Sequence, residues 1–123
     1  MKNQDLLRIC IESLKMIEIR FLENFRKKFK KLHKKNRKLL DDIKKLEKEL
    51  KANPTTGISL GHSMYKIRMA NSSRNIGKSG GFRVITYFID ENDVVYLVEI
   101  YDKSAIESIS VDELRDIWDA EGV

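Results

Sequence analysis

Cysteine, histidine and proline are scarce in this sequence. The single cysteine, Cys10, cannot form an internal disulfide, and the two histidines, His33 and His62, do not combine with it into a zinc-binding pattern. These scarcities argue against a small extracellular domain held together by disulfides and favour a reducing, cytoplasmic location. We expect that the protein needs neither a metal nor a cofactor.

Long apolar runs are also missing. The N-terminal leucines are interrupted by Asp5, Arg8 and Glu12, so they do not form the apolar core of a signal peptide. No later run reaches the roughly 20 residues that span a membrane. We therefore expect a soluble protein with no membrane partner. Its 123 residues, of which 41% are hydrophobic, suffice for one domain with a core and not for two.

Charge is abundant, and it is segregated along the chain. Residues 26–51 contain 13 Lys and Arg against 4 Asp and Glu, and residues 61–88 contain 5 against 0. Residues 89–123 contain 2 against 11. A basic body of this kind attracts a polyanion such as nucleic acid, or an acidic protein, by long-range steering. The alternative for residues 26–51 is a solvated helix face that is rich in lysine.

The N-terminal part divides into two segments. Residues 1–15 carry apolar side chains at helical spacing after Asp5, which predicts a short helix. Apolar and polar residues then alternate over Met16–Phe21, which predicts a strand. We therefore predict one domain over residues 16–123, preceded by an N-terminal extension over residues 1–15.

Apolar side chains recur at steps of three and four over Phe25–Leu50, with Asn36 as the one polar residue in the series. One straight helix over this range would be about 39 Å long, whereas a domain of this size has a radius of gyration of about 14 Å. We therefore expect a hairpin of two helices that breaks near His33–Asn36 and ends before Pro54. The alternative is a dimeric coiled coil in which Asn36 sets the register.

Three further strands are predicted by alternation, at Met64–Ala70, Phe82–Asp90 and Val94–Tyr101. We expect them to form an antiparallel sheet, with Thr55–Ser63 as a loop before it and residues 71–81 as a flexible connection. The fold class is therefore α+β.

The triplet Gly77-Lys78-Ser79 matches part of a phosphate-binding loop. The full motif needs a glycine where Ser72 stands and a helix after the loop, whereas here a strand follows. We reject the motif and keep Lys78 as a candidate contact to a phosphate.

The alternation also sorts the strand residues into two faces. Ile67 and Met69 point to the core, as do Val98 and Ile100. The opposite face of the sheet then carries a set of basic and phenolic side chains, namely Lys66, Arg68, Arg83 and Tyr101, with Lys103 just beyond the last strand. Such a set suits a phosphodiester, although cations on the outer face of a half-buried sheet are also ordinary solvated positions.

These strands carry a resemblance to a known family. The segments Tyr65–Ala70, Gly77–Phe88 and Tyr96–Lys103 resemble the RelE/ParE toxin superfamily, and most closely its HigB-type members. The resemblance covers about residues 16–114. It implies an N-terminal strand, a helical hairpin, a three-stranded antiparallel sheet and a C-terminal helix.

The resemblance also implies an activity and partners. RelE and HigB proteins are ribosome-dependent endoribonucleases that cut mRNA and are silenced by a cognate antitoxin protein. Lys66 and Arg68 fall on the basic pair of the family, Arg83 falls on its next arginine, and Tyr101 and Lys103 fall in the region that supplies the remaining catalytic groups. Ser104 stands where some relatives carry an arginine. The ParE branch, which binds DNA gyrase and needs no catalytic residues, and an inactive relative are the alternatives.

The implied reaction is attack of a ribose 2′-hydroxyl on its own 3′-phosphate. A site for it must accept the 2′ proton, neutralise the phosphoryl oxygens and protonate the leaving oxygen. Arg68 and Arg83 suit the second task, because a guanidinium presents a planar fork to phosphate. We expect a neighbouring cation to lower the pKa of Tyr101 or Lys103 by about two units and so make one of them a base.

The basic helical region is predicted to dock to ribosomal RNA through nonspecific phosphate contacts. The docking residues are Lys27, Lys28, Lys30, Lys31, Lys34, Lys35, Arg37 and Lys38.

The acidic C-terminal segment is predicted to form a final helix. Ser110 and Glu113 have the spacing of a capping box at its N-terminus. Its apolar residues, which we expect to pack on the sheet, are Ile106, Ile109, Leu114, Ile117 and Trp118. A further hypothesis is that an antitoxin captures or moves this segment.

Overall fold

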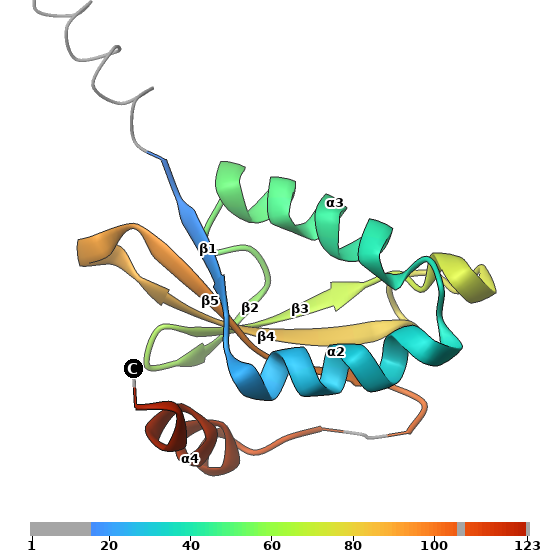
Figure 1. Ribbon diagram of the computed structural model, residues 1–123. Coiled ribbons are helices and arrows are strands. Elements are labelled where there is room, and N and C mark those ends of the chain that lie inside the picture. The colour runs from blue at the N-terminus through green and yellow to red at the C-terminus, as the bar shows by residue number, and fades with distance from the viewer. Residues whose placement is uncertain (1–15, 106–107, 123) are drawn as a thin grey trace, which may run out of the picture.

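A five-stranded sheet with helices on both faces forms the body of the protein (Figure 1). The computed structural model describes residues 16–105 and 108–122. The strand order is β1-β5-β4-β3-β2, in which β1 runs parallel to β5 and all other neighbours are antiparallel. The strands are β1 (Glu18–Phe21), β2 (Ile58–Gly61), β3 (Met64–Met69), β4 (Phe82–Ile89) and β5 (Val94–Asp102).

The predicted helical hairpin is confirmed. It consists of α2 (Glu23–Lys35) and α3 (Leu39–Ala52), and it breaks at Asn36, inside the predicted interval. The backbone N–H and the side-chain amide of Asn36 both donate to the carbonyl of Leu32, at 3.0 Å each. The Asn36 Oδ1 accepts from Asn71 Nδ2 at 2.9 Å. Asn36 therefore ends a helix and anchors the turn instead of setting the register of a coiled coil.

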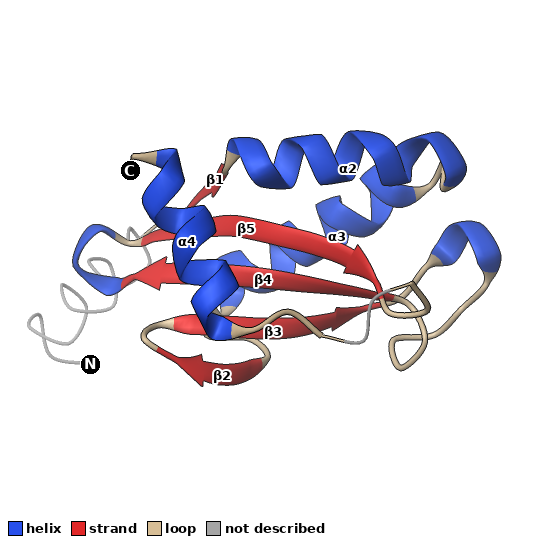
Figure 2. Ribbon diagram, turned by 90° about the horizontal axis from the view of Figure 1, so that it is seen from below, coloured by secondary structure: helices blue, strands red, loops and turns tan. Residues whose placement is uncertain are grey.

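Both faces of the sheet are buried, which corrects the expectation of one core face. The first face packs on α2 and α3, with Phe25, Ile43, Val84 and Leu97 among its buried residues. The second face packs on α4 (Val111–Glu121), whose Leu114 is fully buried there (Figure 2). The predicted basic face is therefore partly covered.

A bulge in β5 overturns the prediction that Val98 and Ile100 share a face. Ile85 pairs with Glu99 and Thr86 pairs with Leu97, so Val98 is an extra residue without a partner on β4. Val98 accordingly lies in the cluster on the α4 side, and Ile100 lies in the cluster on the side of α2 and α3.

The segment Thr55–Ser63, predicted to be a loop, contains the edge strand β2. It pairs antiparallel with β3 through a tight turn in which His62 and Ser63 have φ of 54° and 64°. The sequence pattern that would predict this strand is weak, because the strand has only four residues and its Ile58 is 56% exposed instead of facing the core.

The C-terminal helix forms as predicted. The Ser110 Oγ accepts the N–H of Glu113 at 3.2 Å, which caps α4. Trp118 stacks on Tyr87 with ring centroids 4.4 Å apart, and it meets Tyr96 edge-on at 5.0 Å. Ile106 lies outside the described residues, as does the extension over residues 1–15 with its predicted helix. Among the helices described, none has the length and apolar character needed to cross a membrane.

Candidate active site

Three of the predicted site residues form a row across the sheet. Arg68 on β3 pairs with Arg83 on β4, and Arg83 pairs with Tyr101 on β5. Side chains that pair in this way have Cβ atoms about 4.5–5.5 Å apart. Lys66 lies two residues before Arg68 and therefore on the same face. We call Arg68, Arg83 and Tyr101 the catalytic row after the role that the sequence predicts for them; the register shows that they share one face.

Arg83 is buried, and its guanidinium group donates hydrogen bonds to main-chain carbonyls. The side chain is 5% exposed. Its Nη1 donates to the carbonyls of Lys78 (3.1 Å) and Phe82 (3.2 Å), and its Nη2 donates to the carbonyl of Ser79 (2.9 Å). Sequence reasoning assigned this fork to a phosphate. The structure shows that it holds the glycine-rich loop over residues 77–81, which carries Lys78.

The loop end and the end of β5 meet at Gly81. The N–H of Lys103 donates to the Gly81 carbonyl at 3.1 Å, so the loop bearing Lys78 and the residue after β5 are held together. Lys78 and Lys103 are both exposed. The structure thus brings two exposed lysines to the end of the sheet where the catalytic row lies.

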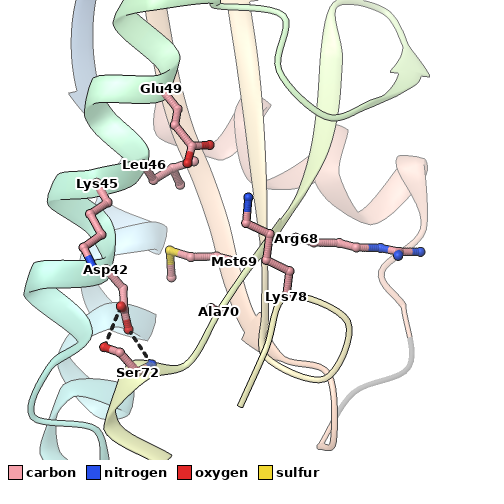
Figure 3. A pocket seen from close by; sticks show the side chains of 9 residues that line it. All are labelled: Asp42, Lys45, Leu46, Glu49, Arg68, Met69, Ala70, Ser72 and Lys78. Carbon is pink, nitrogen blue, oxygen red and sulfur yellow. Dashed lines mark hydrogen bonds between the residues drawn. The ribbon is translucent and has the colours of Figure 1, made fainter. Parts of the chain in front are cut away.

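Arg68 is the exposed member of the catalytic row. It borders a groove of about 130 Å³ between α3, β3 and the loop, together with Lys45 and Lys78. Figure 3 shows its side chain directed away from α3. Two carboxylates also line this groove. Asp42 accepts from Ser72 Oγ (2.7 Å) and from the Ser72 N–H (3.2 Å), which ties the chain just after β3 to α3.

Tyr101 does not have the lowered pKa that we expected from the sequence. It is 3% exposed, and its hydroxyl has no hydrogen-bond partner among the described residues. Burial raises the pKa of Tyr101; the nearby charge of Arg83 opposes this, and Glu99 adds to it. The expectation that a cation lowers this pKa is therefore wrong, because loss of hydration outweighs the arginine. Tyr101 stays protonated at neutral pH and suits a proton donor.

The substitution Tyr101→Phe should leave the free energy of unfolding at pH 7 unchanged or raise it by up to about 1 kcal/mol, because no protein hydrogen bond is lost. Above pH 10 the wild type should lose stability relative to the variant, since the unfolded tyrosine ionises before the folded one. Urea denaturation at both pH values measures this. Tyr96→Phe is the control, because Tyr96 Oη accepts from Arg20 and its loss should cost about 1 kcal/mol. Destabilisation by Tyr101→Phe would show that its hydroxyl is satisfied in solution.

Glu99 is a buried residue that sequence reasoning did not assign. It is 2% exposed, and its Oε2 accepts from Asn24 Nδ2 at 3.0 Å while its Oε1 accepts the N–H of Ile100 at 3.2 Å. Asn24 also donates to the Val98 carbonyl at 2.9 Å. The carboxylate thus anchors the first turn of α2 to β5. A carboxylate that interrupts the apolar run from Val94 to Ile100 was the signal that could have revealed it.

The predicted docking residues are exposed on α2 and on the turn that follows it. Among the described residues none of their side chains forms an ion pair, so the helix presents uncompensated positive charge. They are Lys27, Lys28, Lys30, Lys31, Lys34, Lys35, Arg37 and Lys38. Within the described part of the chain, no group of three or more His, Cys, Asp or Glu side chains could hold a metal ion.

The fold has a counterpart among solved structures. No family model matches the sequence. The chain is similar to a double arginine-to-alanine variant of the E. coli toxin RelE in the free state, with a TM-score of 0.54 and 26% sequence identity. The match covers 76% of this chain and 90% of that one. This chain is therefore a RelE/ParE-like protein, as its strand motifs predicted; its assignment to the HigB type stays a prediction.

Proposed function

We propose that this protein is the toxin of a type II toxin-antitoxin system and that it cleaves mRNA on the ribosome without a metal. The catalytic row carries this proposal. It sets cations and a protonated phenol side by side on one face of a RelE-like fold. A ParE-type inhibitor that acts by binding gyrase would need no such row.

The proposed reaction uses Tyr101 in its protonated state. The 2′-oxygen attacks phosphorus and loses its proton to water, and the Tyr101 hydroxyl gives its proton to the departing 5′-oxygen, while Lys103 contributes positive charge beside the phosphate. The products are a 2′,3′-cyclic phosphate and a 5′-hydroxyl. Arg68 binds the phosphoryl oxygens, assisted by Lys66 and by Lys78 from the loop. In this mechanism Arg83 contributes its charge and the placement of the loop.

The remaining surfaces have roles in the same proposal. The lysines of α2 dock the protein to ribosomal RNA in the cytoplasm. A cognate antitoxin silences the toxin, and the acidic segment around α4 is the part that it captures or moves. This segment covers the end of the sheet face that carries Tyr101, so its position controls access to that side chain.

Expression in a bacterium followed by mapping of mRNA 5′ ends tests the activity. The wild type should produce cuts at fixed positions within codons. Arg68→Ala should reduce them at least 100-fold, because the removed donor acts on the phosphoryl charge of the transition state. Arg68 is exposed, so the variant should fold normally.

Two outcomes would overturn the proposal that the protein is a nuclease. Gyrase-linked DNA damage without mRNA cutting would assign the protein to the ParE type. Toxicity and cutting that persist in Arg68→Ala would show that the reaction occurs elsewhere on the molecule.

A further inference from the structure

The helix α2 lies beside β5, past the end of the short edge strand β1. Strand β1 pairs with β5 only from Glu18 to Phe21, opposite Val94–Leu97. The rest of β5, including Tyr101, has α2 beside it (Figure 2). Asn24 fixes this arrangement through its bonds to the Val98 carbonyl and the Glu99 carboxylate. One side of α2 is therefore next to the catalytic row.

A cavity of about 150 Å³ lies at this junction. Its lining on the α2 side is Lys28, Lys31 and Leu32, and on the side of β5 it is Ile100, Tyr101, Asp102 and Ala105. Tyr101 is also the last member of the catalytic row. The cavity is therefore directly beside the row, and two of the eight lysines and arginines predicted to dock to the ribosome border it.

The charge around this cavity is positive. Lys28 and Lys31 make no ion pair within the described part of the chain. The one carboxylate in the lining, Asp102, keeps its negative charge, and its Oδ1 accepts from the N–H (2.9 Å) and the Oγ (2.8 Å) of Ser104. With two ammonium groups and one carboxylate, the lining carries a net positive charge, which suits an oxyanion.

We propose that two of the α2 lysines assigned above to ribosome docking, Lys28 and Lys31, instead bind the RNA substrate, at a phosphate next to the scissile one. This inference rests on the proposed function. The RNA strand then crosses the sheet from Lys78 and Arg68 on one side, over Tyr101, to α2 on the other. Strands lie about 4.8 Å apart, so the path from β3 to β5 is about 10 Å before it reaches α2. A chain of phosphates supplies anions in series along such a path, whereas an isolated anion does not.

The test compares two double variants with the same change in charge. Lys28→Gln/Lys31→Gln removes the two cavity lysines, and Lys27→Gln/Lys30→Gln removes two exposed lysines with the same spacing on α2 that do not line the cavity. The probe is a fluorescent single-stranded RNA of about 12 nucleotides. It carries 2′-O-methyl groups, so it cannot be cleaved. Fluorescence anisotropy measures its binding to the full chain from about 50 to 200 mM salt, without ribosomes.

We expect the cavity pair to flatten the plot of log K against log salt by about 1.4, because each lost contact to a single strand lowers the slope by about 0.7. This corresponds to roughly 25-fold weaker binding at 0.1 M salt. The control pair should change both quantities by less than half as much. Melting temperatures of both variants should equal that of the wild type, since all four lysines are exposed.

Equal effects of the two pairs would overturn the proposal and leave α2 as a nonspecific basic surface. No effect of the cavity pair would also overturn it and would leave an acidic peptide as the ligand to test. The assay needs neither ribosomes nor cleavage. Failure of the proposed nuclease would instead appear in the mapping of 5′ ends, so the two failures can be told apart.

Discussion

Replacing Arg83 by alanine should abolish mRNA cleavage and also lower the melting temperature by roughly 10 °C. The guanidinium makes three hydrogen bonds to main-chain carbonyls from a site that is 5% exposed. A hydrogen bond to a charged group contributes about 1.5–3 kcal/mol, but the carbonyls of the exposed residues Lys78 and Ser79 can bind water once the guanidinium is gone, so we expect a total near 3 kcal/mol. Cleavage should fall more than 100-fold, because the loop that carries Lys78 loses its anchor.

Arg68→Ala is the matched control for this change. Arg68 pairs with Arg83 across the strands but is exposed, so its loss should reduce cleavage without moving the melting temperature. Thermal melts and amide hydrogen exchange over residues 77–81 measure the difference. Only Arg83→Ala should speed exchange in that loop. If both variants melt like the wild type, the bonds of Arg83 to the loop do not contribute to stability.

The second large effect is expected at Gly81. A Cβ placed there would come within 2.3 Å of the Met69 carbonyl oxygen and 3.0 Å of the Asn71 nitrogen, and both are main-chain atoms that cannot move alone. Gly81→Ala should therefore destabilise the fold by at least about 3 kcal/mol. It should also weaken cleavage, because the Gly81 carbonyl holds the backbone of Lys103.

Gly77→Ala, in the same loop, is the control. A Cβ there would meet nothing within 4 Å, and the backbone of Gly77 lies outside the left-handed region. We expect a change of less than about 1 kcal/mol, in the stabilising direction, because alanine restricts the unfolded chain. Urea denaturation of both variants provides the comparison. Equal stability of the two would show that the main chain around Met69 adapts without cost.

Much of the fold was predictable because it depends on local patterns. The series from Phe25 to Leu50 predicted two helices, and the length of a single helix predicted a break near His33–Asn36, which lies at Asn36 in the structure. The alternation in three strands predicted the central sheet, and Ser110 with Glu113 predicted the cap of α4. Each of these signals lies within a few residues of the structure that it specifies.

Features that depend on pairing between distant segments were not predictable. The bulge at Val98 exists only relative to β4, and it reversed the face to which Val98 was assigned. The short strand β2 exists through its pairing with β3. Neither leaves a clear pattern in its own residues, because strand register is set by the partner strand and by packing on both faces.

The sequence by itself determined which residues can do chemistry here and that Arg68, Arg83 and Tyr101 share one face, because each of them is next to an apolar residue that faces the same core. The tertiary structure decided what each of them is free to do. The guanidinium of Arg83 donates hydrogen bonds to carbonyls of the loop. Burial in the cluster that contains Leu114 raises the pKa of Tyr101. Hydration and hydrogen-bond partners come from segments far apart in the chain, and these set the pKa and the availability of a side chain.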